Sequence, residues 1–446
     1  MKKIGFLLVG VIVVSLLVIP AASAQSILWT SGFQVQNLST SEAHIVISYY
    51  NQDGTKNISD VSATIGGMSS KTYYPIDANE GFNGSVVVSS DQQIVAIANT
   101  LGNTPQYAAS TESFSAGSTT VMLPLIMKAN GGYYTWFNVQ NTGPDDASVT
   151  VAYVPGSHGN AYTASPVTIK PGAAATISQR DLAQLGSKFV GSAVLTSNQP
   201  VVATVMQVGE TFQNMMGYNG FTSGSATVSL PLIMANNSGY YTGFQVQNVG
   251  ASRATVTIEY GDNLAGSFAP SADSVTLDAD ESATFIQNDG KWSGKKYVGS
   301  ATLTCSEPVV AIVNQVRQTG VALGTAYNGF DPQASTNKVS APLIMANNSG
   351  YYTGIQVMNV GSSTASVTVE YGDNQVGSYS PSAETATISP GNSYNSIQNL
   401  GPWSGHKYVG SLTVSGGSGD KIVMIVNQIW PEASGDQFMT YDGFNY

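Results

Sequence analysis

Histidine, cysteine and paired acidic side chains could support catalysis in this 446-residue chain, but they are scarce. The three histidines, His44, His158 and His406, are far apart in the sequence, and a single cysteine excludes a disulfide framework or a Cys-rich zinc site. A nucleophile needs a base and an orienting group within reach, and no hydrolase, metalloprotease, phosphate-loop or dinucleotide motif is present. We therefore predict that the protein is not an enzyme and uses no cofactor.

Two Asp-Asn pairs are weak candidates for metal ligands. They begin at Asp262 and Asp373, each after an equivalent Glu-Tyr-Gly segment. Calcium takes about six to eight oxygen ligands, so two short side chains are too few. Because Gly-Asp-Asn is also typical of tight turns, we predict turns at both places and no metal site.

Repeated aromatic residues are the best candidates for ligand contact, because a ring beside an asparagine could stack on a sugar. The candidates are Tyr240, Tyr241, Tyr351, Tyr352, Trp292 and Trp403. Neighbouring residues of a strand face opposite sides, so one tyrosine of each adjacent pair points inward. We favour packing in the core and between modules as the role of these rings, with glycan binding as the alternative.

The charge of the chain excludes one class of partner. It has 27 acidic and 16 basic residues, a formal net charge of -11, and only 10% charged residues. A nucleic-acid-binding protein needs a basic surface to displace counterions from phosphate, and no run of more than two Lys or Arg residues occurs in the chain. We predict no nucleic-acid partner.

Residues 1–24 have the features of a signal peptide. Lys2 and Lys3 precede an apolar stretch that ends before Pro20, and Ala22 and Ala24 have the spacing of a cleavage site. The apolar stretch is shorter than the roughly 20 residues of a membrane span, and no later segment is long enough to be one. We expect cleavage before Gln25, a secreted, extracellular or cell-surface protein, and no membrane span after cleavage. A retained membrane anchor is the alternative.

Internal repetition divides the rest of the chain. The segments that begin at Leu123, Leu230 and Ala341 share the pattern Pro-Leu-Ile-Met followed by a Tyr-Tyr pair, and a shorter match begins at Ser31. The repeat length of roughly 105 residues is that of a single β-sandwich. We predict a signal peptide and four modules, called repeats 1 to 4: 1–24, then 25–118, 119–224, 225–334 and 335–446.

Alternation of polar and apolar residues predicts strands throughout, as in 255–260 and 366–371. Each repeat also contains a Gly-Ser strand and a later Val/Ile strand, separated by turn-forming residues such as Asn198-Gln199-Pro200, which predicts a hairpin. The predicted fold class is all-β, with four tandem Ig-like β-sandwich domains.

The order of turns and strands resembles a known family. Asn359-Val360-Gly361, then the strand 366–371, then Ser389-Pro390-Gly391-Asn392-Ser393 are similar to the Ig-like, CARDB-type (cell-adhesion-related) modules of prokaryotic surface proteins. The resemblance implies a β-sandwich with a scaffold or adhesion role, and it assigns no functional residues.

Possible N-glycosylation acceptors are candidate surface sites, if the host modifies exported asparagines. They are Asn37, Asn57, Asn83, Asn236 and Asn347.

Repeat 1 is one strand short, because the Pro-Leu-Ile-Met strand occurs in only three of the four repeats. Pro124, Pro231 and Pro342 each remove a backbone donor, which places this strand at a sheet edge. We expect repeat 1 to have an open edge that binds another copy of the chain or a cell-wall component, unless residues 26–30 cover it. The sequence thus predicts a non-enzymatic structural or adhesive surface protein, with extracellular carbohydrate binding as the alternative.

Overall fold

The computed structural model of the protein describes residues 28–102 and 107–446. The predicted signal peptide lies outside the described residues. The fold is all-β, with 60% strand and 2% helix, as the alternating pattern predicted. No helix in the described part of the chain has the length and apolarity to span a membrane.

The strands fall into four groups that follow the sequence repeats. Repeat 1 contains β1 (Trp29–Asn37), β2 (Ala43–Asn51), β3 (Val61–Ile65), β4 (Ser70–Tyr73), β5 (Gly84–Ser90), β6 (Ile94–Gly102) and β7 (Tyr107–Glu112). Repeat 2 contains β8 (Ser118–Lys128), β9 (Tyr133–Asn141), β10 (Ala147–His158), β11 (Tyr162–Thr163), β12 (Val167–Ile169), β13 (Ala174–Ser178), the 3-10 turn η1 (Ala183–Leu185), β14 (Phe189–Gly209) and β15 (Asn214–Asn219).

The second half of the chain repeats this order. Repeat 3 contains β16 (Ser225–Ala235), β17 (Tyr240–Asn248), β18 (Ala254–Tyr260), β19 (Asp273–Leu277), β20 (Ser282–Ile286), η2 (Gly290–Trp292), β21 (Tyr297–Arg317) and β22 (Leu323–Asn328). Repeat 4 contains β23 (Lys338–Ala346), β24 (Tyr352–Asn359), β25 (Ala365–Tyr371), β26 (Glu384–Ile388), β27 (Ser393–Ile397), η3 (Gly401–Trp403), β28 (Tyr408–Ser415), β29 (Ile422–Ile429), β30 (Phe438–Asp442) and β31 (Phe444–Asn445).

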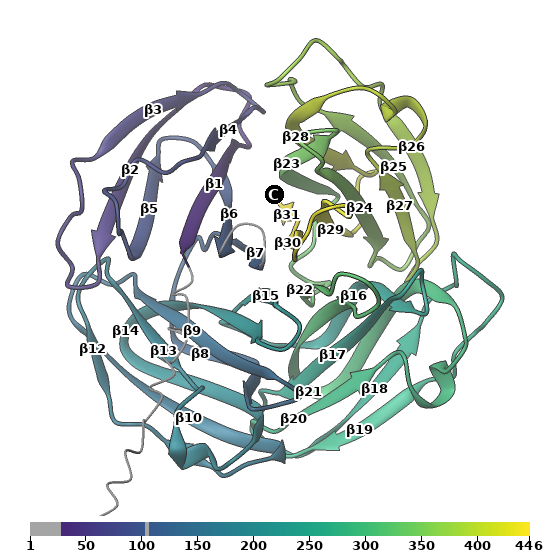
Figure 1. Ribbon diagram of the computed structural model, residues 1–446. Coiled ribbons are helices and arrows are strands. Elements are labelled where there is room, and N and C mark those ends of the chain that lie inside the picture. The colour runs from purple at the N-terminus through teal and green to yellow at the C-terminus, as the bar shows by residue number, and fades with distance from the viewer. Residues whose placement is uncertain (1–27, 103–106) are drawn as a thin grey trace, which may run out of the picture.

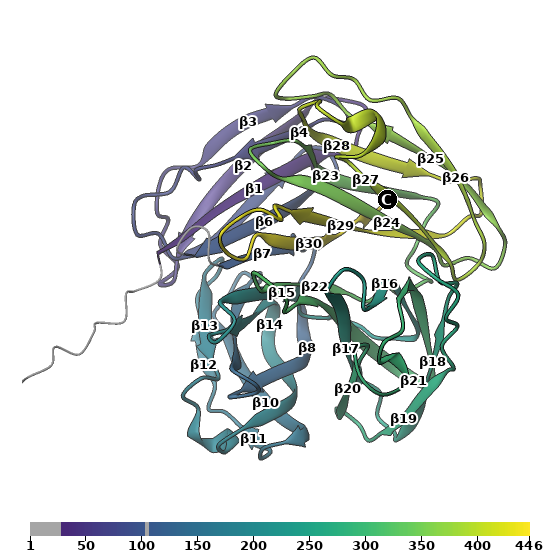
Figure 2. The ribbon, with the colours of Figure 1, turned by 45° about the vertical axis from the view of Figure 1, so that its right-hand side comes forward.

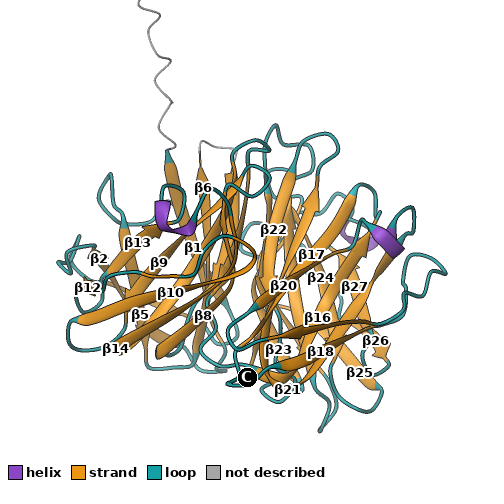
Figure 3. Cartoon of the chain, turned by 90° about the horizontal axis from the view of Figure 1, so that it is seen from below, coloured by secondary structure: helices purple, strands orange, loops and turns teal. Residues whose placement is uncertain are grey.

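The four repeats surround a common centre, and repeat 4 returns to contact repeat 1 (Figures 1 and 2). The strands β7, β15, β22 and β30 lie at this centre, and each contacts the next around a closed circuit. The few short helical turns lie at the periphery (Figure 3). The strands β7, β15, β22 and β30 are thus the elements that join the repeats at the middle of the molecule.

The predicted hairpin between the Gly-Ser strand and the following Val/Ile strand is wrong. In repeats 2 and 3 both segments belong to one strand of 21 residues, β14 or β21. The first half of β14 pairs with β8 and β10, and the second half pairs with β9 and β15. Asn198-Gln199-Pro200 lies where the strand passes from one group of partners to the other, so its turn-forming residues mark a change of partner and not a reversal of the chain.

The alternation predicted for the strands produces the core. In β18 and β25 the side chains of Val256, Ile258, Val367 and Val369 are buried, and the threonines, serine and glutamate between them are exposed or half-buried. Repeats 2, 3 and 4 each have a large apolar cluster that includes their Pro-Leu-Ile-Met strand. Among the described residues, the apolar cluster of repeat 1 has seven buried members, from Val35 to Tyr73.

Serine hydroxyls connect each repeat to the next around the whole circuit. Each serine follows a glycine of the predicted Gly-Ser strand, and its acceptor is a backbone carbonyl of the adjacent repeat. The bonds join Ser85 to Gly172 (2.5 Å), Ser192 to Asp280 (2.5 Å), Ser300 to Gly391 (2.5 Å) and Ser411 to Met68 (3.3 Å). All four acceptors have positive φ, so the same turn is presented at every joint between repeats. The last bond closes the ring.

Amide side chains make a second set of joints. Gln207 and Asn314 exchange two hydrogen bonds of 2.9 and 2.7 Å, and the equivalent pairs are Gln315 with Asn427 and Gln428 with Asn99. The strand registers place Thr100 and Met206 at the equivalent positions between repeats 1 and 2. The joint between repeats 1 and 2 therefore has no amide pair at these positions.

Candidate binding cleft

In its described residues repeat 1 lacks one strand, and a large cleft opens there. In repeats 2 and 3 the Pro-Leu-Ile-Met strands β8 and β16 pair with β14 and β21, and in repeat 4 β23 pairs with β28. The equivalent of these partner strands in repeat 1 is β5, which is the last strand in the sheet order β3-β2-β5. Within the described residues, one edge of β5 therefore has no strand beside it.

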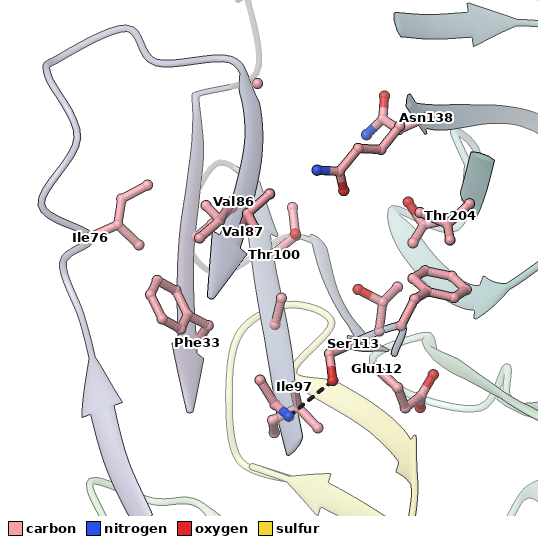
Figure 4. A pocket seen from close by; sticks show the side chains of 18 of the residues that line it. Phe33, Ile76, Val86, Val87, Ile97, Thr100, Glu112, Ser113, Asn138 and Thr204 are labelled. Atoms are coloured by element: carbon pink, nitrogen blue, oxygen red, sulfur yellow. Dashed lines mark hydrogen bonds between the residues drawn. The ribbon is translucent and has the colours of Figure 1, made fainter. Parts of the chain in front are cut away.

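The cleft has a volume of about 2690 Å³ and lies between repeats 1 and 2. One wall comes from repeat 1 and includes Phe33 and Val86, and the other comes from repeat 2 and includes Asn138 and Thr204 (Figure 4). Leu28 and Asn445, close to the two ends of the described chain, also line it. Most of the repeat 1 wall is apolar, as expected for a core that lacks one of its layers of side chains.

Equivalent residues show how far the core of repeat 1 is open. Phe137 and Phe244 are fully buried, whereas the equivalent Phe33 is half-buried and lines the cleft. Val88 is half-buried where the equivalent Leu195 is fully buried, and Val87 is 37% exposed. The residues of repeat 1 are thus of the type that a strand normally covers.

A tyrosine anchor for the strand is also missing from repeat 1. In repeat 2 the Tyr218 hydroxyl donates to the carbonyl of Leu125 (2.8 Å) and accepts from its N–H (3.3 Å). Tyr327 and Tyr441 make the same two bonds with Leu232 and Leu343. The strand register places Thr111 at this position in repeat 1, where it lines the cleft.

The repeat 2 wall carries aromatic and polar side chains. The Trp136 ring lies 6.3 Å from that of Trp29, which is 43% exposed and also lies 6.1 Å from Tyr107. Arg180 pairs with Glu210 at 2.5 Å and covers the ring of Tyr134. Asn138 is equivalent to Gln34, whose amide donates to the carbonyl of Pro342 in the neighbouring repeat (2.9 Å). Asn138 therefore offers a polar group at the place where a carbonyl of a Pro-Leu-Ile-Met strand would lie if repeat 1 had one.

A ring of four equivalent polar residues closes the centre beside the cleft. The Asn328 amide accepts from the N–H of Asn219 (3.0 Å) and donates to its carbonyl (2.7 Å). The N–H of Asn328 donates to Asp442 Oδ2 (3.2 Å), and the N–H of Asp442 donates to Glu112 Oε1 (2.7 Å). Asn219 Nδ2 donates to the carbonyl of Glu112 (2.9 Å) and completes the ring.

Two members of this polar ring are acids where the others are amides. An amide offers a donor and an acceptor, whereas an ionised carboxylate offers acceptors only. Burial raises the pKa of Glu112 to about 7. Burial, and then the nearby Glu112, raise the pKa of Asp442 well above its usual value, and Asp442 Oδ1 is buried without a partner. The neutral acids suit this ring because a protonated oxygen can donate as the amide nitrogen does.

The candidate tryptophans are core residues. Trp292 is 3% exposed and packs edge-on against Tyr260, Phe268 and Tyr297. Trp403 is 2% exposed and packs in the same way against Tyr371, Tyr379 and Tyr408. Neither indole offers a surface for a sugar ring in this conformation.

The candidate tyrosines are half-buried, and two of them, Tyr240 and Tyr241, contact a neighbouring repeat. Tyr240 packs against Phe438 of repeat 4, and burial raises its pKa to about 12. Tyr241 packs against the core of repeat 2, and Tyr351 against Trp430. Tyr352 is half-buried, and burial raises its pKa. The structure does not bring these four rings together with the two tryptophans.

The acidic candidates do not converge on a shared site. Asp262 is exposed, and its carboxylate accepts from Asn392 of repeat 4 (2.6 Å). Asp373 is exposed in repeat 4. Among residues 28–102 and 107–446, no three His, Cys, Asp or Glu side chains are close enough to hold a metal ion together.

The predicted glycosylation sites differ in accessibility. Asn37 is fully buried, and its amide donates to three backbone carbonyls, so the prediction that it is a surface site is wrong. Asn57 is half-buried and Asn83 is exposed. Asn236 and Asn347 are exposed, but their amide nitrogens donate to the carbonyls of the loops that carry Trp292 and Trp403.

Comparison with known proteins assigns no family to this chain. No family model matches it, and no match was found among the curated proteins. One similar solved structure, described as the crystal structure of Thermotoga maritima 1070, is 19% identical, and the match covers 24% of this chain and 94% of that one with a TM-score of 0.21. The function must therefore be argued from the molecule itself.

Sequence reasoning missed the residues that line the cleft and join the repeats. The Gly-Ser pairs were identified only as parts of strands, although their fourfold recurrence was the available signal for the joints. Thr111, Glu112 and Asn138 carry no motif. Their roles depend on contacts between repeats, which the spacing of residues within one repeat does not reveal.

Proposed function

We propose that the protein is an exported, non-enzymatic structural or adhesive element of the cell surface, built from four Ig-like β-sandwich modules closed into a ring. The observation that carries this proposal is the repeated joint. The same serine-to-carbonyl bond connects every repeat to the next, including repeat 4 to repeat 1. A ring in which each module is held on two sides is suited to a rigid scaffold.

The chemistry of the chain supports a role through shape. Only 10% of the residues are charged, and the histidines lie in different repeats. His44 contacts Asp91 at 2.9 Å on an exposed surface, and His406 stacks on Tyr379 at 4.1 Å. His158 Nδ1 lies 3.1 Å from Ser157 Oγ on an exposed surface. None of these three pairs lines the cleft between repeats 1 and 2, which favours a scaffold over an enzyme. The cleft between repeats 1 and 2 is then the natural place for attachment.

Protease treatment of intact cells of the native host, followed by detection with an antibody to this chain, tests the proposal. We expect the protein to be degraded on intact cells while a cytoplasmic control survives, and immunogold labelling to lie on the outer surface. Protection from protease until the cells are lysed would contradict the proposal.

Carbohydrate binding is the second candidate, and the cleft gives it a more suitable site than the predicted tyrosines and tryptophans. Trp29 and Trp136 lie edge to face at the cleft, and Trp29 is 43% exposed. A glycan array with the wild type, Trp29→Ala and the control Trp430→Ala tests this candidate. Binding that Trp29→Ala alone abolishes supports it, and an array without binding excludes the tested glycans.

A further inference from the structure

We propose that the cleft of repeat 1 binds an extended strand of a partner protein, which pairs antiparallel with the free edge of β5 and completes the core. This inference rests on the proposed export and removal of residues 1–24. The partner strand is uncharged, with apolar side chains on both sides of a central proline. The proposed binding is strand addition to a sheet edge, in which backbone bonds give affinity and side chains give specificity.

Three occupants of the equivalent position are visible within the molecule itself. The strands β8, β16 and β23 each pair with the strand equivalent to β5, and each has a central proline. In β8 the side chains of Val121, Leu123 and Ile126 are fully buried in the core of repeat 2. These strands define the kind of segment that fits against Val86, Val88 and Phe33 in repeat 1.

The mature chain does not supply this strand to its own cleft. Pro124, Pro231 and Pro342 each stand nine residues before the first tyrosine of the following pair. In repeat 1, Trp29 is the equivalent of those first tyrosines. Pro20 lies nine positions before Trp29, so the segment that matches β8 is 14–24. That segment is within the predicted signal peptide. Cleavage before Gln25 leaves only residues 25–27 ahead of the described chain, which is too short for an 11-residue strand such as β8.

The charges at the cleft fit an uncharged strand. The charged residues among those that line it are Glu80, Glu112, Arg180 and Glu210, and the last two neutralise each other. The part of the repeat 1 wall that is formed by Phe33 and by residues 86–88 and 94–98 carries only valine, isoleucine, alanine and phenylalanine side chains. A charged side chain buried against this apolar wall would lose its hydration, so the strand should resemble the segment 225–235, which contains no charged residue.

Two groups are placed to receive the backbone of the strand. In repeats 2 and 3 the residue after the Tyr-Asn-Gly sequence exchanges backbone bonds with the Pro-Leu-Ile-Met strand, Phe221 with Met122 and Phe330 with Ser229. The equivalent residue in repeat 1, Phe114, lines the cleft. Asn138 lies on the opposite wall. Its amide can donate to a carbonyl of the partner strand, as the amide of the equivalent Gln34 donates to the carbonyl of Pro342.

The missing tyrosine anchor should make the proposed binding weaker than the packing of an internal strand. Each internal strand is held by a buried hydroxyl that bonds to both backbone groups of one leucine. Thr111 cannot reach that far, so a partner strand lacks these two bonds. The same difference provides a gain-of-function test, because Thr111→Tyr restores the anchor and Thr111→Phe restores only its ring.

Fluorescence anisotropy with a labelled peptide tests the proposal. The peptide has the sequence of residues 225–235, with a solubilising tail, and the protein is the full-length gene product expressed in and purified from the native host. We expect saturable binding, and no binding of a peptide with the same residues in scrambled order. Thr111→Tyr should bind about tenfold more tightly than Thr111→Phe, because two buried hydrogen bonds are worth roughly that ratio.

Several outcomes overturn the proposal, and amino-terminal sequencing of the purified protein separates them from a failure of export. A chain that begins at Gln25 but binds no peptide, or binds the scrambled one equally, refutes strand addition and leaves the proposed function intact. Binding only after removal of a retained segment 1–24 identifies the chain's own leader as the occupant. A dimer that the peptide dissociates identifies a second copy instead of a different partner.

Discussion

Repeats 1 and 2 have similar sequences but differ in how completely their cores are closed. Phe33 and Phe137 follow the same pattern of neighbours in strands that align residue by residue, yet Phe137 is fully buried and Phe33 is half-buried in the wall of a cleft. The side chain that is missing above Phe33 belongs to the Pro-Leu-Ile-Met strand, which repeat 2 has and the described part of repeat 1 lacks. Local sequence thus determines the strand, whereas closure of the core depends on a separate segment.

The largest expected effect compares these two phenylalanines. Phe137→Ala should lower the free energy of unfolding by about 3–5 kcal/mol, because it leaves a cavity in a closed core. Phe33→Ala should cost less than about half of that, since its ring already borders the cleft. Chemical denaturation of both variants measures the difference. Equal losses would mean that the cleft is closed in solution.

The acids of the central polar ring should make stability depend on pH. The pKa of Glu112 is raised to about 7 in the folded state, so the folded protein holds a proton that the unfolded chain has released. The contribution of Glu112 to the free energy of unfolding should therefore be largest below about pH 4.5. Between about pH 4.5 and pH 7 this contribution should fall by at most about 1.4 kcal/mol per pH unit.

The amides of repeats 2 and 3 provide the matched variants for this pH effect. Glu112→Gln with Asp442→Asn should flatten the fall, because all four positions then carry amides that do not titrate. Thermal unfolding from pH 4 to 8 measures it. A pH profile that these substitutions leave unchanged would show that the dependence comes from other groups.

A smaller effect is expected from the tyrosine anchor. Tyr327→Phe should destabilise the protein by about 1–3 kcal/mol, because Leu232 loses a partner for both its N–H and its carbonyl. Thr111→Val is the control in repeat 1, where no strand is anchored, and should change the free energy of unfolding by less than about 0.5 kcal/mol. Comparable losses would contradict the anchoring role.

The smallest expected effect concerns the joint without an amide pair. Thr100→Gln with Met206→Asn should install between repeats 1 and 2 the pair that the other three joints contain, and should raise the free energy of unfolding by about 0.5–1 kcal/mol. Gln207→Leu in the intact joint with Asn314 should act in the opposite direction. A double-mutant cycle gives the coupling between the two introduced residues.

The strands could be predicted from the sequence because their burial is local. Alternation identified 255–260 and 366–371, which lie within β18 and β25. The hairpins were wrong because turn-forming residues such as Pro200 describe the local chain, whereas partner strands decide whether that chain reverses or continues.

The candidate site could be predicted only in outline. Counting the Pro-Leu-Ile-Met strands predicted that repeat 1 would be one strand short, and the structure leaves β5 at a sheet edge. The opposite wall could not be predicted, because Asn138 and Trp136 reach the cleft only through the ring arrangement. Closure of that ring depends on contacts such as Gln34 with Pro342, which are 308 residues apart in the sequence.

The bond between Ser411 and Met68 matches the three bonds that join successive repeats, so the fold does not depend on which repeat comes first in the chain. Leu28 and Asn445 both border the cleft of repeat 1, but Figure 3 shows the two ends of the described chain on opposite faces of the molecule, so a link between them would have to span its thickness. A circularly permuted gene that encodes such a link could begin with a repeat that is complete, and the opening would remain in the same place. The gap lies in repeat 1 because the segment that matches the Pro-Leu-Ile-Met strand there, 14–24, falls within the predicted leader.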